Sequence, residues 1–454
     1  MLPLALILKA RGADVEGSDR SLDAGRTAAK FEFLKSRGIK LYPQDGSGVT
    51  RQEQLLVTSA AVEDTVPDVV AAKRLGCPRV SRPQLLAELV NTAKVSVAVG
   101  GTSGKSTTTG MIGWILYAAR RDPTVMNGAI MKNFVAGDAP FASSIVGAGD
   151  IFVSEVDESD GSIALYNPTI AVLNNIALDH KTMDELRSLF SAFIAKARTA
   201  ILNLDNDETR RLAEGVKHAN ALTYSLTDPN ADFVASDIVN AVDGQSCIVT
   251  EKSTGEKARI CLQTPGRHNL SNGLAAIAAA RACGLSLREA TMALMNFVGI
   301  RRRLEVVGTR QDITVIDDFA HNPDKIAATL ATLHAFPGRL LLMWQPHGYG
   351  PIRQMKDQFV EMFARDLAPK DILFMPEPAY FGGTVDRSMG SSVIAEGVTA
   401  KGKQAYALPD RPACGDKLVE LAQPGDVIVV MGARDDTLSE FAADMLRRVG
   451  EKSF

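Results

Sequence analysis

The sequence is poor in cysteine and in aromatic residues, and it contains no long apolar run. Its cysteines form no Cys-x-x-Cys pair and are odd in number, which argues against a disulfide framework and against a cysteine-bound metal. Reduced thiols are typical of the cytoplasm, where we expect the protein to be located. The five cysteines are Cys77, Cys247, Cys261, Cys283 and Cys414.

No apolar stretch reaches the roughly 18 residues that a transmembrane helix requires, so none is predicted. The apolar start, residues 1–9, lacks a basic segment and a small-residue cleavage site, and we interpret it as a helix. The net charge is −3 with acids and bases interleaved, so the basic surplus that favours binding to nucleic acid or anionic membranes is absent. We therefore expect neither partner.

The length of 454 residues is too great for one hydrophobic core, and about three domains are expected. Helix and strand signals alternate along the chain, which predicts α/β domains with mostly parallel sheets. We place the domains at residues 1–90, 91–299 and 300–454, with a hinge at residues 299–303. Buried strands are predicted at residues 94–99, 150–155, 170–174, 313–316, 339–343, 371–375 and 427–431, and a β-rich stretch at 220–262.

The first domain shows an unusual order of elements. A doubly wound domain normally opens with a strand and a glycine-rich turn, but this sequence opens with a helix over residues 3–11. Further helices are predicted at 27–37 and 67–75, with strands near 14–19 and 55–58. We therefore expect a dinucleotide-type fold that lacks its first strand and glycine loop, the place where such domains bind a nucleotide diphosphate.

Residues 97–109 read Val-Ala-Val-Gly-Gly-Thr-Ser-Gly-Lys-Ser-Thr-Thr-Thr and form the most informative stretch. An apolar strand enters a glycine-rich turn, and an apolar helix follows, which is the layout of a phosphate-binding loop. Lys105 would reach the β- and γ-phosphates, and the Ser106 hydroxyl would hold Mg²⁺. Val99 stands where the general pattern has glycine, and an ordinary glycine-rich turn is the alternative interpretation.

Polar residues follow the next two predicted strands. Glu155, Asp157, Glu158 and Asp160 come after one strand, and residues 174–180 (Asn-Asn-Ile-Ala-Leu-Asp-His) follow the other. Ligands bind at the carboxyl ends of parallel strands, and carboxylates beside a phosphate loop can hold Mg²⁺. The alternatives are that the acidic residues form a solvated turn and that His180 is an ordinary core or surface side chain that binds no metal.

Residues 264–276 contain two asparagines three positions apart at the start of a helix. Asn269 and Asn272 lie on one helical face, so their amides could pair with the edge of an adenine base. Helix capping by Asn269 is the alternative.

Together these motifs resemble the Mur ligase family, the ATP-dependent amide-forming enzymes of peptidoglycan synthesis. Gly-Thr-Ser-Gly-Lys-Ser-Thr-Thr is similar to the family's phosphate loop, and Pro-Gly-Arg-His-Asn-Leu-Ser-Asn to its later helix. Further similar segments lie at 297–305, 315–323 and 345–353, so the resemblance extends over nearly the whole chain. It implies three α/β domains: a UDP-substrate domain, a central ATP-binding domain, and a C-terminal domain for the amino acid and nucleotide.

The resemblance also implies roles for individual residues. The catalytic residues would be Lys105, Glu155, His180 and His321, and Mg²⁺ would be bound by Ser106, Glu155 and His180. ATP would be bound by Gly101, Thr102, Ser103, Gly104, Lys105, Ser106, Thr107, Asn175, His268, Asn269, Asn272, Arg303 and Asp318, with Arg302 the second choice for Arg303. The nucleotide sugar and the amine would be bound by Ser18, Asp19, Ser59, Asn127, Glu158, Ser159, His347, Tyr349 and Arg353.

Within the family, the acidic string most resembles two members: the one that adds L-alanine to UDP-N-acetylmuramate through an acyl phosphate, releasing ADP and phosphate, and a relative that attaches a whole tripeptide. The resemblance favours the first of these as the activity. Gly348 and Pro351 replace two arginines of that member, which favours as an alternative the relative that adds the tripeptide L-Ala-γ-D-Glu-meso-diaminopimelate; Arg434 could supply a substitute guanidinium. Lys196 lies near the position of a carbamylated lysine, but a plain surface lysine is favoured. A folylpolyglutamate synthase-like ligase and an inactive relative are further alternatives. A monomer or homodimer is expected.

Overall fold

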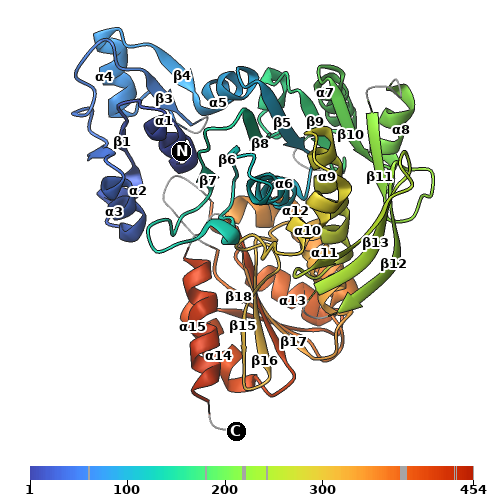
Figure 1. The fold of residues 1–454 in the computed structure, drawn as a ribbon. Coiled ribbons are helices and arrows are strands. Elements are labelled where there is room, and N and C mark those ends of the chain that lie inside the picture. The colour runs from blue at the N-terminus through green and yellow to red at the C-terminus, as the bar shows by residue number, and fades with distance from the viewer. Residues whose placement is uncertain are drawn as a thin grey trace. The chain divides into compact units, whose positions relative to one another are not determined.

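The computed structural model describes residues 1–59, 62–178, 181–216, 221–241, 244–378, 386–433, 435 and 437–452 (Figure 1). By their internal contacts these residues form two compact units, the larger made mainly of residues 1–299 and the smaller mainly of residues 300–454. The chain passes from one to the other inside the segment predicted as a hinge.

The first part of the larger unit alternates between helices and short parallel strands, as predicted. Its elements are α1 (Leu2–Ala10), β1 (Glu16–Ser18), α2 (Arg20–Asp23), α3 (Ala28–Ser36), β2 (Lys40–Tyr42), β3 (Leu56–Thr58), α4 (Pro67–Leu75), β4 (Arg79–Ser81) and α5 (Arg82–Asn91). The expectation of one open sheet is wrong: β1 pairs with β2 and β3 pairs with β4, both in parallel, as two separate sheets.

The helix predicted at the start of the chain is confirmed as α1. Its buried Leu4 and Ile7 share a hydrophobic core with Leu86 and Val90 of α5 and with side chains of the central sheet. A capping box, in which Ser81 and Gln84 bond each other's backbone N–H groups, fixes the start of α5. The first part of the chain is thus anchored to the central sheet by two amphipathic helices.

The central sheet has ten strands in the order β14-β13-β12-β11-β10-β9-β5-β8-β6-β7. Its strands are β5 (Val95–Gly100), β6 (Thr124–Met126), β7 (Ser144–Ile145), β8 (Ile151–Glu155), β9 (Ile170–Leu173), β10 (Thr199–Asn203), β11 (Ala221–Ser225), β12 (Phe233–Ala241), β13 (Gly244–Glu251) and β14 (Lys257–Leu262). β5 is paired in parallel with β8 on one side and β9 on the other. The carboxyl ends of these three predicted strands therefore meet at one edge of the sheet.

The larger unit also contains five α-helices and two 3₁₀ helices among its described residues outside the first part. α7 packs on β9 and β10 with Phe190 and Phe193 fully buried, and the Thr182–Glu185 capping box fixes its start. These helices are α6 (Lys105–Ala118), η1 (Lys132–Phe134), η2 (Ser162–Leu165), α7 (Met183–Ala195), α8 (Asp207–Gly215), α9 (Arg267–Ala282) and α10 (Leu287–Leu294).

The smaller unit is a six-stranded sheet in the order β15-β16-β20-β17-β18-β19, parallel except for β15. Its strands are β15 (Glu305–Arg310), β16 (Ile313–Asp318), β17 (Leu340–Gln345), β18 (Ile372–Pro376), β19 (Gln404–Leu408) and β20 (Val427–Gly432). Its helices are α11 (Pro323–Leu333), α12 (Tyr349–Asp366), α13 (Ser392–Ala400), α14 (Arg411–Leu421) and α15 (Leu438–Gly450).

Both faces of this sheet are covered by helices. Along β17, Leu342 and Trp344 point into the core shared with α11, α12 and α13, whereas Leu341 and Met343 point into the core shared with α14 and α15. Alternation with a period of two along an all-apolar strand is the pattern of a strand buried on both faces. The predicted α/β layering of this unit is confirmed.

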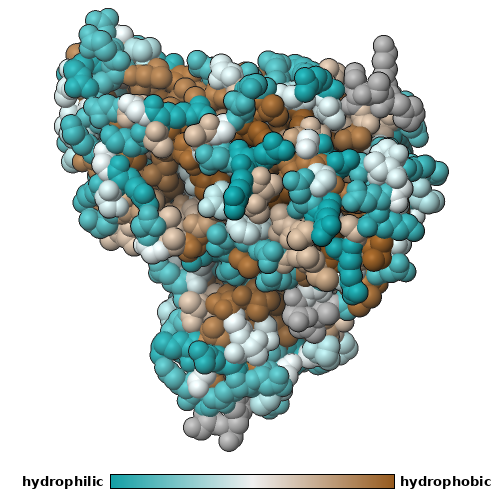
Figure 2. Space-filling view, in the orientation of Figure 1, coloured by the Kyte–Doolittle hydropathy of each residue, from teal (hydrophilic) through white to brown (hydrophobic). Residues whose placement is uncertain are grey.

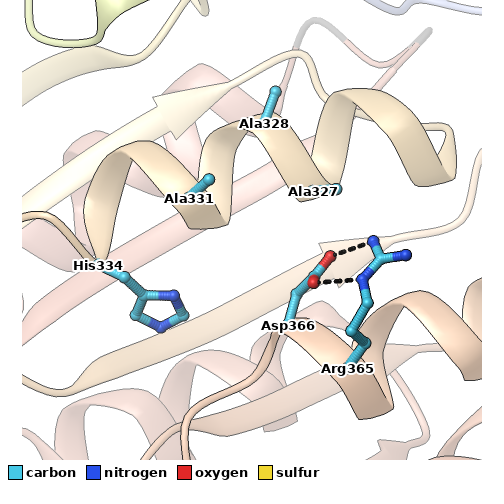
Figure 3. A pocket seen from close by; sticks show the side chains of 6 residues that line it. All are labelled: Ala327, Ala328, Ala331, His334, Arg365 and Asp366. Atoms are coloured by element: carbon cyan, nitrogen blue, oxygen red, sulfur yellow. Dashed lines mark hydrogen bonds and ion pairs between the residues drawn. The ribbon is translucent and has the colours of Figure 1, made fainter.

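A hollow of about 520 Å³ lies on the smaller unit between α11 and the end of α12 (Figure 3). None of the predicted site residues lines it; its lining is Ala327, Ala328, Ala331, His334, Arg365 and Asp366. Hydrophilic residues are spread over the face shown in Figure 2, with apolar residues among them. Among the described residues, no helix combines the length and the apolar character that crossing a bilayer requires.

Candidate active site at the phosphate loop

The predicted strand, glycine loop and helix are all present. β5 ends at Gly100, the loop occupies residues 101–104, and α6 begins at Lys105. Gly104 has φ of +81°, and a Cβ on it would lie 2.5 Å from Asn272 Oδ1. Glycine is required there both for the left-handed backbone and for the close approach of α9.

Two asparagines after β9 hold the loop in place. Asn175 Oδ1 accepts hydrogen bonds from Thr102 Oγ1 (2.8 Å) and from the Ser103 N–H (3.0 Å), and Asn174 Nδ2 donates to Thr108 Oγ1 (2.9 Å). Asn175, predicted to bind ATP, therefore contacts the loop itself. Its contact with nucleotide stays a prediction.

The four acids of residues 155–160 divide into two pairs. Asp157 and Asp160 each accept a backbone N–H two residues further on, and they shape the turn into η2. Glu155 and Glu158 face the phosphate loop instead: Ser106 Oγ donates to Glu155 Oε2 (2.7 Å), and Lys105 Nζ donates to Glu158 Oε2 (2.8 Å). The sequence placed all four acids at this edge of the sheet, but only the structure separates their roles.

Two oxygen donors suited to Mg²⁺ lie together beside the loop. Ser106 Oγ and the Glu155 carboxylate are hard oxygen ligands in contact with each other, and phosphate oxygens and water would complete such a site. His180, the third predicted ligand, and Asp179 lie outside the described residues. Within the part of the chain that the structure describes, no group of three or more acidic, histidine or cysteine side chains is placed for a metal.

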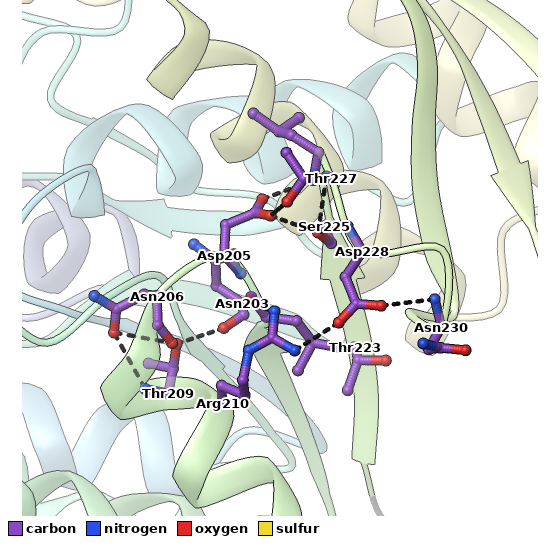
Figure 4. A network of polar contacts seen from close by, with 12 residues as sticks. Asn203, Asp205, Asn206, Thr209, Arg210, Thr223, Ser225, Thr227, Asp228 and Asn230 are labelled. Atoms are coloured by element: carbon purple, nitrogen blue, oxygen red, sulfur yellow. Dashed lines mark hydrogen bonds and ion pairs between the residues drawn. The ribbon is translucent and has the colours of Figure 1, made fainter.

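The segment that leads toward His180 is fixed by two amides that sequence reasoning missed. Asn203 Nδ2 donates to the Asn174 carbonyl (2.9 Å). Asn206 accepts from the Ile176 N–H (3.2 Å), donates to the Ile176 carbonyl (3.3 Å) and also caps α8 (Figure 4). The available signal was a polar Asn-Leu-Asp-Asn run after the buried strand β10, beside a second polar run after β9.

Asn269 and Asn272 are both buried and lie on one face of α9, as their spacing predicted. Asn272 Nδ2 lies 3.3 Å from Asn269 Oδ1, and Asn272 Oδ1 lies 3.4 Å from Asn174 Nδ2. The pair thus connects α9 to the phosphate loop. Adenine recognition by these two amides and His268 stays a prediction.

Several residues predicted to bind substrate make contacts within the protein. Asn127 Nδ2 donates to the Ser106 carbonyl (2.8 Å), the Ser159 N–H donates to Asp157, and Asp19 caps α2. Ser18 donates to Asp68 at the end of β1, while Ser59 follows the end of β3. Their contacts with substrate stay predictions.

The two candidate arginines of the smaller unit are separated by the structure. Arg302 is buried and donates to Asp317 (3.3 Å) and to the carbonyls of Gly432 (2.6 Å) and Asp435 (2.9 Å). Both guanidinium groups lie over the Phe319 ring, that of Arg303 4.5 Å and that of Arg302 5.2 Å from its centroid. Arg302 is therefore bound inside the smaller unit, and the contact of Arg303, the first choice, with nucleotide stays a prediction.

Asp318 is buried at the end of β16, and its carboxylate accepts from the N–H groups of Leu304 (3.1 Å) and Phe319 (2.9 Å) and from Thr329 Oγ1 (2.5 Å). Its predicted contact with nucleotide is untested, and in this structure the carboxylate organises the start of the smaller unit.

Two predicted histidines come together: the His321 and His347 rings are 5.3 Å apart, edge to face. His321 Nδ1 lies 2.8 Å from the Phe319 carbonyl, which can only accept, so Nδ1 carries the proton and Nε2 is the acceptor. Burial, Lys325 and His347 lower the pKa of His321 to about 3, against the opposing effect of the Phe319 carbonyl. The ring is therefore neutral at neutral pH.

Tyr349 begins α12 and is nearly buried, while Arg353 forms an ion pair with Asp386 (2.6 Å). Arg434 lies outside the described residues. Sequence reasoning missed Arg411, which donates to Gln345 (2.9 Å), Thr437 (2.8 Å) and Asp435 at the carboxyl ends of β17 and β20. No motif marks it, because its partners are distant in the sequence.

We expect the contribution of Asp317 to the stability of the smaller unit to fall as pH rises from about 4 to 7. Burial raises the pKa of Asp317 to about 6, although Arg302 and Ser439 oppose this shift. Between these pH values the folded state holds a proton on Asp317 that the unfolded state has lost. The contribution of Asp317 is therefore fully present below its unfolded pKa. It is lost as pH rises through its folded pKa, a change on the order of 1–3 kcal/mol. Calorimetry of the wild type and Asp317→Asn across this range tests it, since parallel pH curves for the two proteins would contradict it.

Comparison with known proteins identifies the family. Residues 1–94 match the Mur ligase family catalytic domain, 99–280 the Mur ligase middle domain, and 302–434 the Mur ligase glutamate ligase domain. The UDP-N-acetylmuramate–L-alanine ligase of Acetivibrio thermocellus is 33% identical, covering 96% of this chain and 91% of that protein. The enzyme of the same name from a Nostoc species is 34% identical, covering 95% and 91%.

The chain belongs to the Mur ligase family. Its fold agrees with that of the UDP-N-acetylmuramate–alanine ligase from Thermotoga maritima, with a TM-score of 0.77, 24% identity and coverage of 99% and 96% of the two chains. It also agrees with the murein peptide ligase from Psychrobacter arcticus, with a TM-score of 0.72, 26% identity and coverage of 100% and 97%.

Membership of the Mur ligase family confirms the predicted three-domain α/β architecture and the prediction of an ATP-dependent ligase that forms amide bonds. The match over residues 1–94 argues against the folylpolyglutamate synthase-like alternative, which lacks this first domain. Lys196 Nζ donates to the Ala164 carbonyl (2.6 Å), and the preference for an unmodified lysine stays a prediction.

Proposed function

We propose that this Mur ligase joins L-alanine to UDP-N-acetylmuramate in peptidoglycan synthesis, in the cytoplasm and with Mg²⁺. The observation that carries the proposal is the phosphate loop whose Lys105 and Ser106 face two carboxylates at one strand end. The choice of L-alanine and UDP-N-acetylmuramate as substrates is supported by relatives named for this reaction, which are 30–34% identical to the chain over nearly its full length.

In the proposed reaction the γ-phosphoryl group of ATP passes to the substrate carboxylate and forms an acyl phosphate. The amine of L-alanine attacks the acyl carbon, and phosphate leaves through a tetrahedral intermediate. Lys105 and the loop N–H groups would stabilise charge on the transferring phosphoryl group. Mg²⁺, held by Ser106, Glu155 and His180, would neutralise charge on phosphate oxygens when bound.

His321 supports a site for the incoming amine in the smaller unit. Its neutral ring leaves Nε2 able to accept a hydrogen bond from an amine, and His347 lies against it. A histidine kept neutral at physiological pH avoids repelling the ammonium form in which an amino acid arrives. No side chain has to act as a nucleophile.

Addition of the tripeptide is a second candidate function. Gly348 and Pro351 stand in place of two arginines, and Arg353 is paired with Asp386, so the segment offers few guanidinium groups for the carboxylate of a single amino acid. The similarity in fold to a murein peptide ligase agrees with this candidate.

Phosphate release distinguishes the candidates. The full chain is incubated with Mg²⁺, ATP and UDP-N-acetylmuramate, with L-alanine in one series and L-Ala-γ-D-Glu-meso-diaminopimelate in the other. Release that depends on L-alanine supports the main proposal, and release only with the tripeptide supports the second. Release with neither, by a chain that still binds ATP, would overturn both and favour an inactive relative.

A further inference from the structure

Lys105 and Ser106, the two functional side chains of the phosphate loop, are both paired with carboxylates in this structure. The Lys105–Glu158 pair is largely buried, with 19% of the lysine side chain and 3% of the glutamate side chain exposed. Lys105 Nζ donates in addition to the Gly101 carbonyl (2.7 Å). The ammonium is therefore bound by the protein on two sides.

A carboxylate oxygen and a phosphate oxygen are equivalent kinds of acceptor for an ammonium group. A nucleotide that uses Lys105 must therefore compete with Glu158. Losing Lys105 costs free energy for Glu158, because its carboxylate is buried and Lys105 is its only cationic partner among the described residues. The approaching phosphates also meet the negative charge of Glu158 at short range.

We propose that Glu158 is the resting counter-ion of Lys105, which opposes nucleotide binding and makes it depend on a divalent cation. When Lys105 turns to the nucleotide, the Glu158 carboxylate loses its cationic partner. A metal ion that arrives with the nucleotide would supply positive charge in its place, whereas nucleotide without metal would not. Glu158 is thus a positioning residue that sets nucleotide affinity, in place of the substrate-binding role predicted from the sequence. The inference rests on the proposed function, because it takes Lys105 to be the phosphate-binding lysine.

Asp157 offers a matched control on the same turn. Burial would raise the pKa of Asp157, but the Ser159 N–H and hydroxyl, together with Lys105 and Arg82, hold it below its usual range. Its carboxylate makes a local contact with the Ser159 N–H (2.9 Å) and has no hydrogen bond to Lys105. Asp157→Asn therefore removes one negative charge from the same segment and leaves the Lys105–Glu158 contact in place.

The experiment measures the dissociation constant of ATP for wild type, Glu158→Gln and Asp157→Asn, each with EDTA and with Mg²⁺. In EDTA we expect Glu158→Gln to bind ATP at least about tenfold more tightly than wild type, because a like charge is removed beside the phosphates. With Mg²⁺ the gain should shrink to less than about threefold, and Asp157→Asn should stay within about twofold of wild type throughout. Melting temperatures check that the variants are folded.

The outcomes separate the two levels of the argument. Equal affinity of Glu158→Gln and wild type in EDTA, weaker binding by Glu158→Gln, or the same gain with Asp157→Asn would overturn the role of Glu158 while leaving the ligase proposal intact. Failure of all three folded proteins to bind ATP under either condition would instead contradict the proposed function and the inference with it.

Discussion

Replacing Lys105 with methionine should lower ATP-dependent phosphate release by about 10²–10³-fold, because a positioned cation on the transferring phosphoryl group is lost. The same change should also destabilise the larger unit by about 2–4 kcal/mol, because it leaves Glu158 buried without its cationic partner. Calorimetric melting and the phosphate-release assay measure the two effects on the same protein.

A second substitution separates the two effects. Adding Glu158→Gln to Lys105→Met removes the unpaired carboxylate, so most of the lost stability should return while activity stays as low as in Lys105→Met. Lys94 serves as the control: its bond to Asp150 is 2.7 Å long, similar to the Lys105 pair, but the side chains are 75% and 62% exposed. Lys94→Met should therefore cost much less stability than Lys105→Met, because an exposed ion pair is screened by water. Equal costs at Lys94 and Lys105, or no recovery in the double variant, would contradict the argument from burial.

Gly104→Ala should reduce ATP affinity by at least about 10²-fold and lower stability by about 1–3 kcal/mol. The new Cβ would stand 2.5 Å from Asn272 Oδ1 and 2.8 Å from Asn174 Nδ2, on a backbone with φ of +81°. Either the loop shifts, which misplaces the N–H groups before α6, or α9 and the segment after β9 move away. Both responses disrupt the phosphate-binding geometry, which a nucleotide titration would detect.

Gly402 provides the control for backbone strain, because its φ is also +81° and a Cβ there would meet no atom within 4 Å. Gly402→Ala should lower stability only by the cost of backbone strain, about 1 kcal/mol, and should leave ATP affinity unchanged. If Gly104→Ala behaved like Gly402→Ala in both measurements, the close packing of Asn272 against the loop would not be required for binding.

The contrast between Arg302 and Arg303 shows what a motif can predict. Both belong to the same basic segment, and the sequence ranked Arg303 first only by resemblance. The structure adds the tertiary contacts: both guanidinium groups lie over Phe319, and that of Arg302 is bound inside the smaller unit by Asp317 and two carbonyls. Three of those partners come from elements more than ten residues away, and local pattern carries no information about them.

The sequence by itself determined the elements and the edge of the sheet at which the chemistry lies. Apolar strands followed by glycine or by acidic and amide residues are local patterns, so β5, β8 and β9 and the loop before α6 were predictable. Only the tertiary structure decided which acid meets which loop residue, since Lys105 and Glu158 are 53 positions apart and are paired through the register of β5 with β8. It also decided that the first strands form two sheets, because strand pairing depends on neighbours in space.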